Sequence, residues 1–185
     1  LMSFQYGFDL WVKNCIFRNS WGGGLWFTDC TNPCAHYNYA VGNRGSNIAF
    51  RNDPSSTTQP ARGGEAVGNV TDGGIIGVHI MFGATGGRIV GNDCRNSRNA
   101  QSYPSWAYAG TYPNVYPIDE AGNPIAGFNQ PGNPNYVSPA LLGDGAGIEA
   151  SGFYTNPDPL TRTPNSGRTI TANVCENNMT GIRLE

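Results

Sequence analysis

Five asparagines open similar stretches of this 185-residue chain, and their spacing constrains the fold more than any other feature. They are Asn14, Asn38, Asn69, Asn92 and Asn173. Four of them are followed, after 9 to 11 residues, by two apolar residues spaced two apart. Asn92 obeys the same rule if residues 98–144 are treated as an insertion. This self-similarity is an internal repeat, which decides the architecture before any local pattern does.

The distances between these asparagines give the length of the repeating unit. They are 24, 31, 23 and 81 residues. The step of 31 contains the polar stretch 54–64, and the step of 81 contains 98–144 together with a second polar loop, 154–167. Without these loops every step is close to 23 residues, which is the size of one coil of a parallel β-solenoid. One coil cannot bury its own apolar face, so neighbouring coils must stack.

The apolar pairs predict which side chains face the inside of the stack, because alternate residues of a strand point to opposite faces. The inward columns read Met2, Leu25, Ile48, Val78, Ile148, Ile182 and Phe4, Phe27, Phe50, Ile80, Ala150, Leu184. The outward columns read Ser3, Trp26, Ala49, His79, Glu149, Arg183 and Gln5, Thr28, Arg51, Met81, Ser151, Glu185. The residue before the pair is Gly24, Asn47, Gly77, Gly147 or Gly181. We expect a left-handed corner there, since glycine and asparagine tolerate that backbone.

Several segments resemble the repeats of right-handed parallel β-helix proteins, which include bacterial extracellular proteins. They are "GRIVGNDCRNS", "GDGAGIEASGF", "RTITANVCENNMTGIRLE" and "NCIFRNSWGGGLWFTDC". The resemblance covers most of the chain outside the insertions. It implies an all-β, right-handed parallel β-helix of about six coils in an extracellular or cell-surface protein. Polysaccharide lyases, hydrolases, epimerases and adhesins share that fold, so the resemblance does not fix a reaction.

Composition excludes some partners and leaves others open. The net charge is −2 with 13% charged residues, and no basic stripe is present, so we expect no nucleic-acid partner. No apolar run approaches the length of a membrane span. The chain starts and ends inside predicted strands without caps, although solenoid ends need them. We therefore expect one β-helix domain, 1–185, that is a segment of a longer protein or is covered by neighbouring chains.

The five cysteines allow two pairings. Cys30 and Cys34 lie four apart and could close a tight loop as a disulfide. Cys94 and Cys175 each follow a corner asparagine by two residues, so they belong to adjacent coils as a stacked inward pair or a disulfide.

No metal or other cofactor is expected from the spacing of potential ligands. His36 and His79 are the only histidines, and the cysteines around them match no zinc pattern. A calcium site is unsupported as well, because the aspartates are scattered without a loop pattern. They are Asp29, Asp53, Asp93 and Asp144.

The loops point to one sheet as the working face. Stretches 54–64 and 154–167 leave the coil just after the outward columns, and the insertion 98–144 enters just before them. Loops at both edges would wall this sheet into a groove, where function concentrates. The insertion is rich in proline and tyrosine and carries Trp106 and Tyr108, which suit sugar stacking and protein interfaces alike. The simpler alternatives are that the insertion packs on itself as a lid and that the loops have no function.

On that sheet, His79 and Glu149 are predicted to be neighbours, with Arg183 one coil beyond and Arg51 diagonal to His79. A histidine beside a carboxylate suits general acid–base catalysis, and an arginine nearby could hold a uronate carboxylate. Trp26, Asp29, Asp144, Trp106 and Tyr108 are the candidate sugar contacts. The alternative is a surface ion pair of small energetic value between Glu149 and Arg183, with His79 a bystander.

Two functions follow from these patterns. The first is an extracellular domain that binds or processes a polysaccharide or other glycan, with a lyase-like or hydrolase-like reaction if it is an enzyme. The second is a structural or adhesive solenoid that self-associates through its open ends and aromatic loop. The orientation of the insertion distinguishes the two, since a glycan site needs its aromatic side chains over the outward column.

Overall fold

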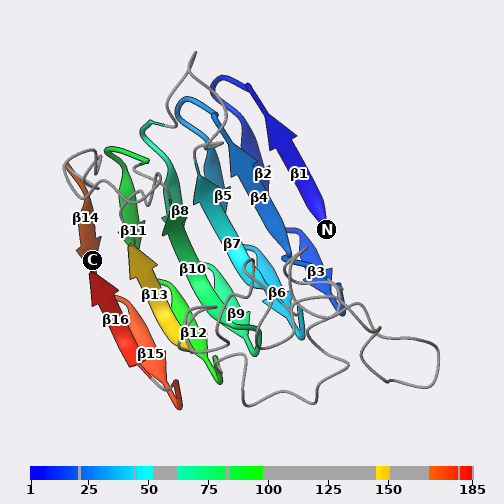
Figure 1. Ribbon diagram of the computed structural model, residues 1–185, viewed down its shortest axis with the longest axis vertical. Coiled ribbons are helices and arrows are strands. Elements are labelled where there is room, and N and C mark those ends of the chain that lie inside the picture. Colours follow the sequence, from blue (N-terminus) through cyan, green and yellow to red (C-terminus); the bar gives the residue numbers. More distant parts are fainter. Residues whose placement is uncertain are drawn as a thin grey trace, which may run out of the picture.

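Three parallel sheets, each with one strand per coil, make up the computed structural model, which describes residues 1–20, 22–43, 45–51, 62–81, 84–97, 145–150, 167–178 and 180–184 (Figure 1). Sheet A contains β1 (Met2–Gln5), β4 (Leu25–Thr28), β7 (Ser46–Arg51), β10 (Ile76–Met81), β13 (Ala146–Ala150) and β16 (Thr180–Leu184). Sheet B contains β2 (Trp11–Lys13), β5 (Cys34–His36), β8 (Glu65–Val67), β11 (Arg88–Val90) and β14 (Thr169–Thr171). Sheet C contains β3 (Ile16–Arg18), β6 (Tyr39–Val41), β9 (Val70–Asp72), β12 (Asp93–Arg95) and β15 (Val174–Glu176).

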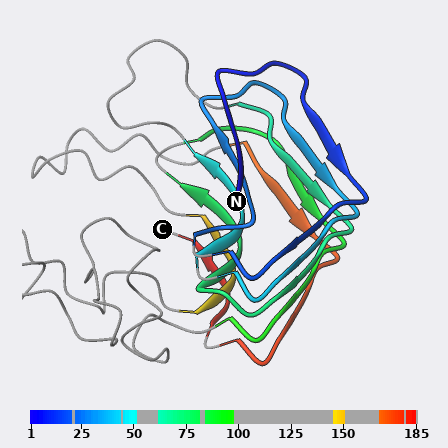
Figure 2. The same ribbon diagram turned by 90° about the vertical axis from the view of Figure 1, so that its right-hand side faces the viewer.

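Consecutive strands go to sheets A, B and C in turn, and each sheet is joined by parallel pairing between successive coils. The chain is therefore a parallel β-helix of about six coils, as the repeat predicted. Figure 2 shows successive coils, from blue to orange, repeating one angular outline. The inserted loop 98–144 lies outside the described residues. Within the described ranges, the structure contains no helix long and apolar enough to span a membrane.

The predicted inward columns form the core. Leu25, Ile48, Val78 and Ile148 stand in direct register on neighbouring strands and are fully buried. The second column begins with three phenylalanine rings whose centroids are 5.6 and 5.4 Å apart, in the order Phe4, Phe27, Phe50. Each buried side chain of this size contributes about 1.5–3 kcal/mol, so the apolar files stabilise the stack along its whole length.

The corners between the strands are left-handed and fall five residues apart. Three columns of positive φ flank sheets B and C. They comprise Asp9, Asn32, Gly63, Gly86 and Gly167; Asn14, Tyr37, Gly68, Gly91 and Ala172; and Asn19, Gly42, Gly73, Asn96 and Asn177. A three-residue strand plus a two-residue corner therefore builds each of these two sides. Asparagine and glycine dominate the columns because they adopt this backbone at the lowest cost.

The expectation of a left-handed corner before each apolar pair is wrong. Gly24, Gly77, Gly147 and Gly181 do not have positive φ. At Gly24, Gly77 and Gly147 close packing requires glycine instead, since a Cβ at Gly77 would lie 2.4 Å from the carbonyl oxygen of Gly147. The tight approach of neighbouring residues, not the backbone dihedral, selects glycine at these three positions.

A ladder of buried asparagine side chains runs along the stack beside sheet C. The side chain of Asn69 donates to Asn92 Oδ1 at 2.9 Å and to the carbonyl of Ala35 at 2.7 Å. Its Oδ1 accepts from the backbone N–H and the side-chain amide of Asn38. Asn92 and Asn173 repeat the pattern. The ladder satisfies corner backbone groups that would otherwise be buried without partners.

The first position of this ladder is Cys15 and not Asn14. The backbone N–H of Cys15 donates to Asn38 Oδ1, and Asn14 occupies the left-handed corner one residue earlier. The first step of the repeat is therefore 23 residues, from Cys15 to Asn38, and not 24.

The cysteines are all free thiols. The hypothesised Cys30–Cys34 disulfide is therefore wrong. Cys94 and Cys175 stand in register on β12 and β15 and face the core as a stacked pair, which is one of the two predicted alternatives. Their side chains are hydrogen-bonded to each other, and this contact together with burial raises the pKa of Cys94.

Candidate functional site on the outer face of sheet A

One outward column of sheet A brings together most of the predicted site residues. Register pairs join Trp26, Ala49, His79, Glu149 and Arg183, in this order, on β4, β7, β10, β13 and β16. Arg51 lies beside this column, in register with Thr28 and Met81. The sheet therefore supplies the juxtaposition that the alternation predicted, with one residue per coil about 4.8 Å apart.

His79 is at the centre of the column and contacts side chains from both neighbouring coils. Its Nε2 lies 3.5 Å from Glu149 Oε1, and its Nδ1 lies 2.9 Å from Ser46 Oγ. His79 is only 4% and Glu149 only 6% exposed, so this pair is enclosed. An interaction held in such a site is much stronger than one in water.

Burial decides the charge of His79. Desolvation lowers the pKa of this imidazole to about 3, although a carboxylate 3.5 Å away would by itself favour the protonated ring. Desolvation has the larger effect on the pKa of His79, because the ring is almost completely buried and the contact with Glu149 is long. The ring is therefore neutral at physiological pH and carries one N–H. With that N–H on Nε2, facing Glu149, Nδ1 accepts the hydroxyl of Ser46.

Ser46 is the site residue that strand alternation misses. Strict period two places Ser46 inside with Ile48 and Phe50. The side chain of Asn47 is buried, accepts a hydrogen bond from Asn43 at 2.8 Å and donates to the carbonyl of Gly73 at 2.7 Å. Two consecutive residues then face inward, and Ser46 emerges on the outer side. The asparagine in a column otherwise filled by glycine was the available signal.

Trp26 and Arg51 extend the contacts along the sheet. The indole N–H of Trp26 donates to the carbonyl of Ser46 at 3.2 Å. The guanidinium carbon of Arg51 lies 5.4 Å from the centre of the Trp26 ring, within the range of a cation–π interaction. A continuous set of contacts thus runs from Trp26 through Ser46 and His79 to Glu149.

The remaining predicted contacts are distributed differently. Asp29 is buried in a left-handed corner after β4, two coils from the strand that carries His79, so it does not join the pair. Arg183 is half-buried in register with Glu149. Trp106, Tyr108 and Asp144 lie outside the described residues.

A possible metal-binding group occurs elsewhere, on sheet B. Among the described residues, Cys34, His36 and Glu65 have ligand atoms within 4.8 Å of one another. The sequence predicted no metal site because only the spacing of ligands along the chain was compared, whereas Glu65 comes from the next coil. Ligand sets assembled across coils are not visible in local motifs.

The fold and this site define a parallel β-helix with a buried histidine–carboxylate pair on one sheet. Comparison with protein-family models, with curated proteins and with solved structures gave no match to this chain. Function is therefore inferred from the residues of the site on sheet A.

Proposed function

We propose that this chain is a glycan-engaging β-helix domain that binds or cleaves an acidic polysaccharide on the outer face of sheet A. The observation that carries the proposal is the His79–Glu149 pair, enclosed between Ser46 on one coil and Arg183 in register on another. A secreted or cell-surface location is part of this proposal, because structural polysaccharides occur there.

The pKa of His79 assigns the roles within the pair. A general acid or base works best when its pKa is near the working pH, and an imidazole with a pKa of about 3 is a weak base. Glu149 is therefore the group that would transfer the proton to or from the sugar. Neutral His79, fixed by Ser46, would orient the carboxyl through Nε2–H. Arg51 and Arg183 would bind the carboxylate of a uronic acid.

The side chain of Trp26 suits the same substrate class. Its ring is half-buried and fixed by the hydrogen bond to Ser46 and by the contact with Arg51. An aromatic ring held in this way offers an apolar face to a sugar at little cost in conformational entropy.

The test is a cleavage assay on acidic and neutral polysaccharides, with Glu149→Gln and His79→Ala. Both substitutions should abolish cleavage. A new ultraviolet absorbance from an unsaturated product would indicate a lyase, and reducing ends without it a hydrolase. Glu176→Gln, the same change on exposed β15, is the matched control and should leave activity unchanged. Full activity of Glu149→Gln would eliminate this site.

Access to the pair provides a second readout that needs no turnover. His79 is 4% exposed and contacts side chains from both neighbouring coils, so its ring signals report on this face of sheet A. The protein contains two histidines, so the ring signals of His79 and His36 can be assigned by single substitution. A glycan that binds here should shift the His79 signals and leave those of His36 in place; the reverse pattern would contradict the proposal.

A second candidate is assembly through the ends of the stack. The terminal coils expose apolar side chains, including Leu1 at 64% and Leu184 at 69%. The end of a second copy of this chain would cover them. Sedimentation should then show self-association that Ile182→Lys removes and Tyr39→Lys, on an exposed side position, does not. A monomer at all concentrations would exclude assembly of this chain with itself.

A further inference from the structure

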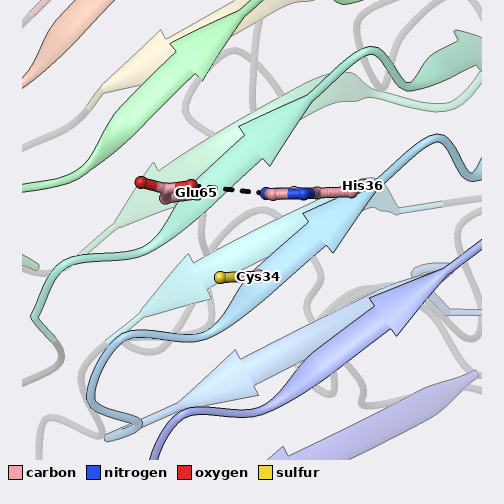
Figure 3. A group of neighbouring side chains, drawn as sticks. All are labelled: Cys34, His36 and Glu65. Atoms are coloured by element: carbon pink, nitrogen blue, oxygen red, sulfur yellow. Dashed lines mark ion pairs between the residues drawn. The ribbon is translucent and has the colours of Figure 1, made fainter.

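The outer face of sheet B carries a compact group of three different ligand types. Cys34 and His36 lie two apart on β5, so both project from the same face, and Glu65 is the register partner of Cys34 on β8. Ala35 and Ala66, between them, point into the core. Figure 3 shows the three side chains beside one another, with those of His36 and Glu65 directed toward each other. The distance from His36 Nε2 to Glu65 Oε2 is 3.4 Å.

The distances suit a single ion. All three ligand atoms lie within 4.8 Å of one another. Ligands that share one tetrahedral zinc ion are roughly 3.3–3.8 Å apart, given metal–ligand lengths of about 2.0–2.3 Å. Rotations of the cysteine and glutamate side chains would make up the difference of about 1 Å. The strands already fix the backbone positions, so little order has to be created on binding.

His36 supplies an independent indication of a ligand. Its Nε2 is buried and makes no hydrogen bond, and Glu65 at 3.4 Å is too poorly aligned to provide one. A buried polar atom without a hydrogen bond costs about 1–3 kcal/mol. The ring is held in place by edge contacts with Trp11, at 5.0 Å, and Tyr37, at 6.1 Å, so this nitrogen stays directed at the group. A metal ion on Nε2 would satisfy it.

Charge in the neighbourhood favours a cation. The negative charges of Glu65 and Asp9 act on the Cys34 side chain. A divalent cation would offset these charges and would bind the cysteine as its thiolate. The opposing charges are Lys13, in register with His36, and Arg88, whose Nη1 is 4.0 Å from Glu65. Arg88 is mostly exposed, so this long ion pair contributes little and can open.

We propose that Cys34, His36 and Glu65 bind one zinc-class divalent cation, with water or an added ligand as the fourth donor. One thiolate, one imidazole and one carboxylate match the donors zinc accepts, and three protein ligands are typical of sites that keep one position for exchange. This site lies on sheet B, apart from the His79–Glu149 pair on sheet A, so neither proposal depends on the other.

The test is titration of the chelator-treated, reduced full chain with Co²⁺, followed by displacement with Zn²⁺. Cobalt should give a thiolate charge-transfer band and strong visible bands of four-coordinate geometry, with one ion per chain. Cys34→Ser, His36→Gln and Glu65→Gln should each weaken binding by more than about a hundredfold, because losing an outer partner of a ligand alone costs 10- to 100-fold. Zn²⁺ should raise the Tm of the parent and of none of these variants.

Two control variants test whether another thiol or the other histidine binds the ion. Cys15→Ser and His79→Gln should leave the cobalt spectrum and the affinity unchanged. Cys94→Ser tests the stacked cysteine pair. A band that is lost in Cys94→Ser but kept in Cys34→Ser would assign the ion to that pair and overturn the proposal, as would the absence of any thiolate band in the parent. Glu65→Gln provides the variant least able to disturb folding, because Glu65 is partly exposed.

Discussion

Cys15 lies directly against Asn38 in the stack, and its backbone N–H donates to Asn38 Oδ1 at 3.1 Å. At the next three positions, Asn38, Asn69 and Asn92, the side-chain amide makes a second hydrogen bond to the oxygen that already accepts the backbone N–H. Cys15→Asn should add this missing bond and stabilise the protein by about 1 kcal/mol. Urea unfolding measures the gain. Cys15→Ala, which removes the thiol without adding an amide, should show none, and equal effects of the two substitutions would refute the explanation.

The middle of the ladder should be far more sensitive. Asn69→Ala removes bonds to Asn38, Asn92 and the carbonyl of Ala35, and it leaves buried donors and acceptors without partners. We expect a loss of about 3–5 kcal/mol in the free energy of unfolding, from two or more such groups. Asn14→Gly is the control, since glycine keeps the left-handed backbone of that corner and no ladder bond is lost. A loss below about 1 kcal/mol for Asn69→Ala would contradict a structural role of the ladder.

Ala172 occupies a left-handed corner with φ of 55°, in a column where two other coils have glycine. A left-handed backbone costs a residue with a Cβ about 1–2 kcal/mol, and glycine costs about 0.5–1 kcal/mol of entropy on folding. Ala172→Gly should therefore stabilise the fold by about 0.5–1 kcal/mol. Ala40→Gly, in a buried strand position, should do the opposite. Thermal unfolding of the two variants is the measurement, and the same sign for both would count against the assigned strain.

Acid should destabilise the protein through His79. Burial lowers the pKa of this ring from 6.5 to about 3, so between these values the unfolded chain binds a proton that the folded chain does not. Stability therefore falls as the pH falls through this window and is constant above it, and the full effect is on the order of a few kcal/mol.

The measurement for His79 is the free energy of unfolding from pH 3 to pH 8. His79→Gln removes the titrating group and should flatten the curve, whereas Asn14→Gly, which removes no titrating group, should keep the slope of the parent. Carboxylates add a slope of their own in acid, so the difference between parent and His79→Gln is the quantity of interest. Parallel curves for these two proteins would show that His79 is not protected from protons.

The stacked pair Cys94 and Cys175 should be open to crosslinking. Register partners on adjacent parallel strands are about 4.8 Å apart, within the Cα separation that disulfides use. Diamide would take up the two electrons and two protons released as the S–S bond forms. The bond would close a loop of 81 residues and stabilise the fold by about 4 kcal/mol in the chain-entropy estimate.

Mass spectrometry of peptides after diamide treatment identifies the crosslink, and its removal by a reductant should reverse the gain in Tm. Cys175→Ser, which resembles Thr71 in the same inward column, is the control and should not respond. Formation of a Cys30–Cys34 bond in its place would mean that the inward pair is too well packed to react.

The sequence predicted the sheet of stacked apolar pairs because its signal is strong: inward and outward residues alternate and repeat at nearly constant distance. Single-residue details were beyond it. Asn14 and Cys15 differ by one position in a stretch where both roles, the corner and the ladder, accept asparagine. Alternation placed Ser46 on the wrong side of the sheet, because Asn47 and Ile48 both face inward.

The chemistry of the sites was harder to foresee than their positions. The neighbourhood of His79 and Glu149 follows from register, but their exposure of only 4% and 6% does not follow from periodicity. The group of Cys34, His36 and Glu65 requires register across a step of 31 residues that contains a loop. Only the paired strands bring a residue from the next coil within reach of a short motif.

The five-residue spacing of the left-handed corners has a consequence for how such a chain can change. From Asp9 to Asn14 to Asn19, and at every equivalent point in the later coils, this distance is constant, whereas both arms that flank sheet A vary in length. The segment that contains the strands of sheets B and C therefore has the same length in every turn. Duplication or loss of one whole turn would preserve the parallel register of the remaining strands, so the stack can grow or shorten by recombination. Changes in length within one turn are confined to the segments that flank sheet A.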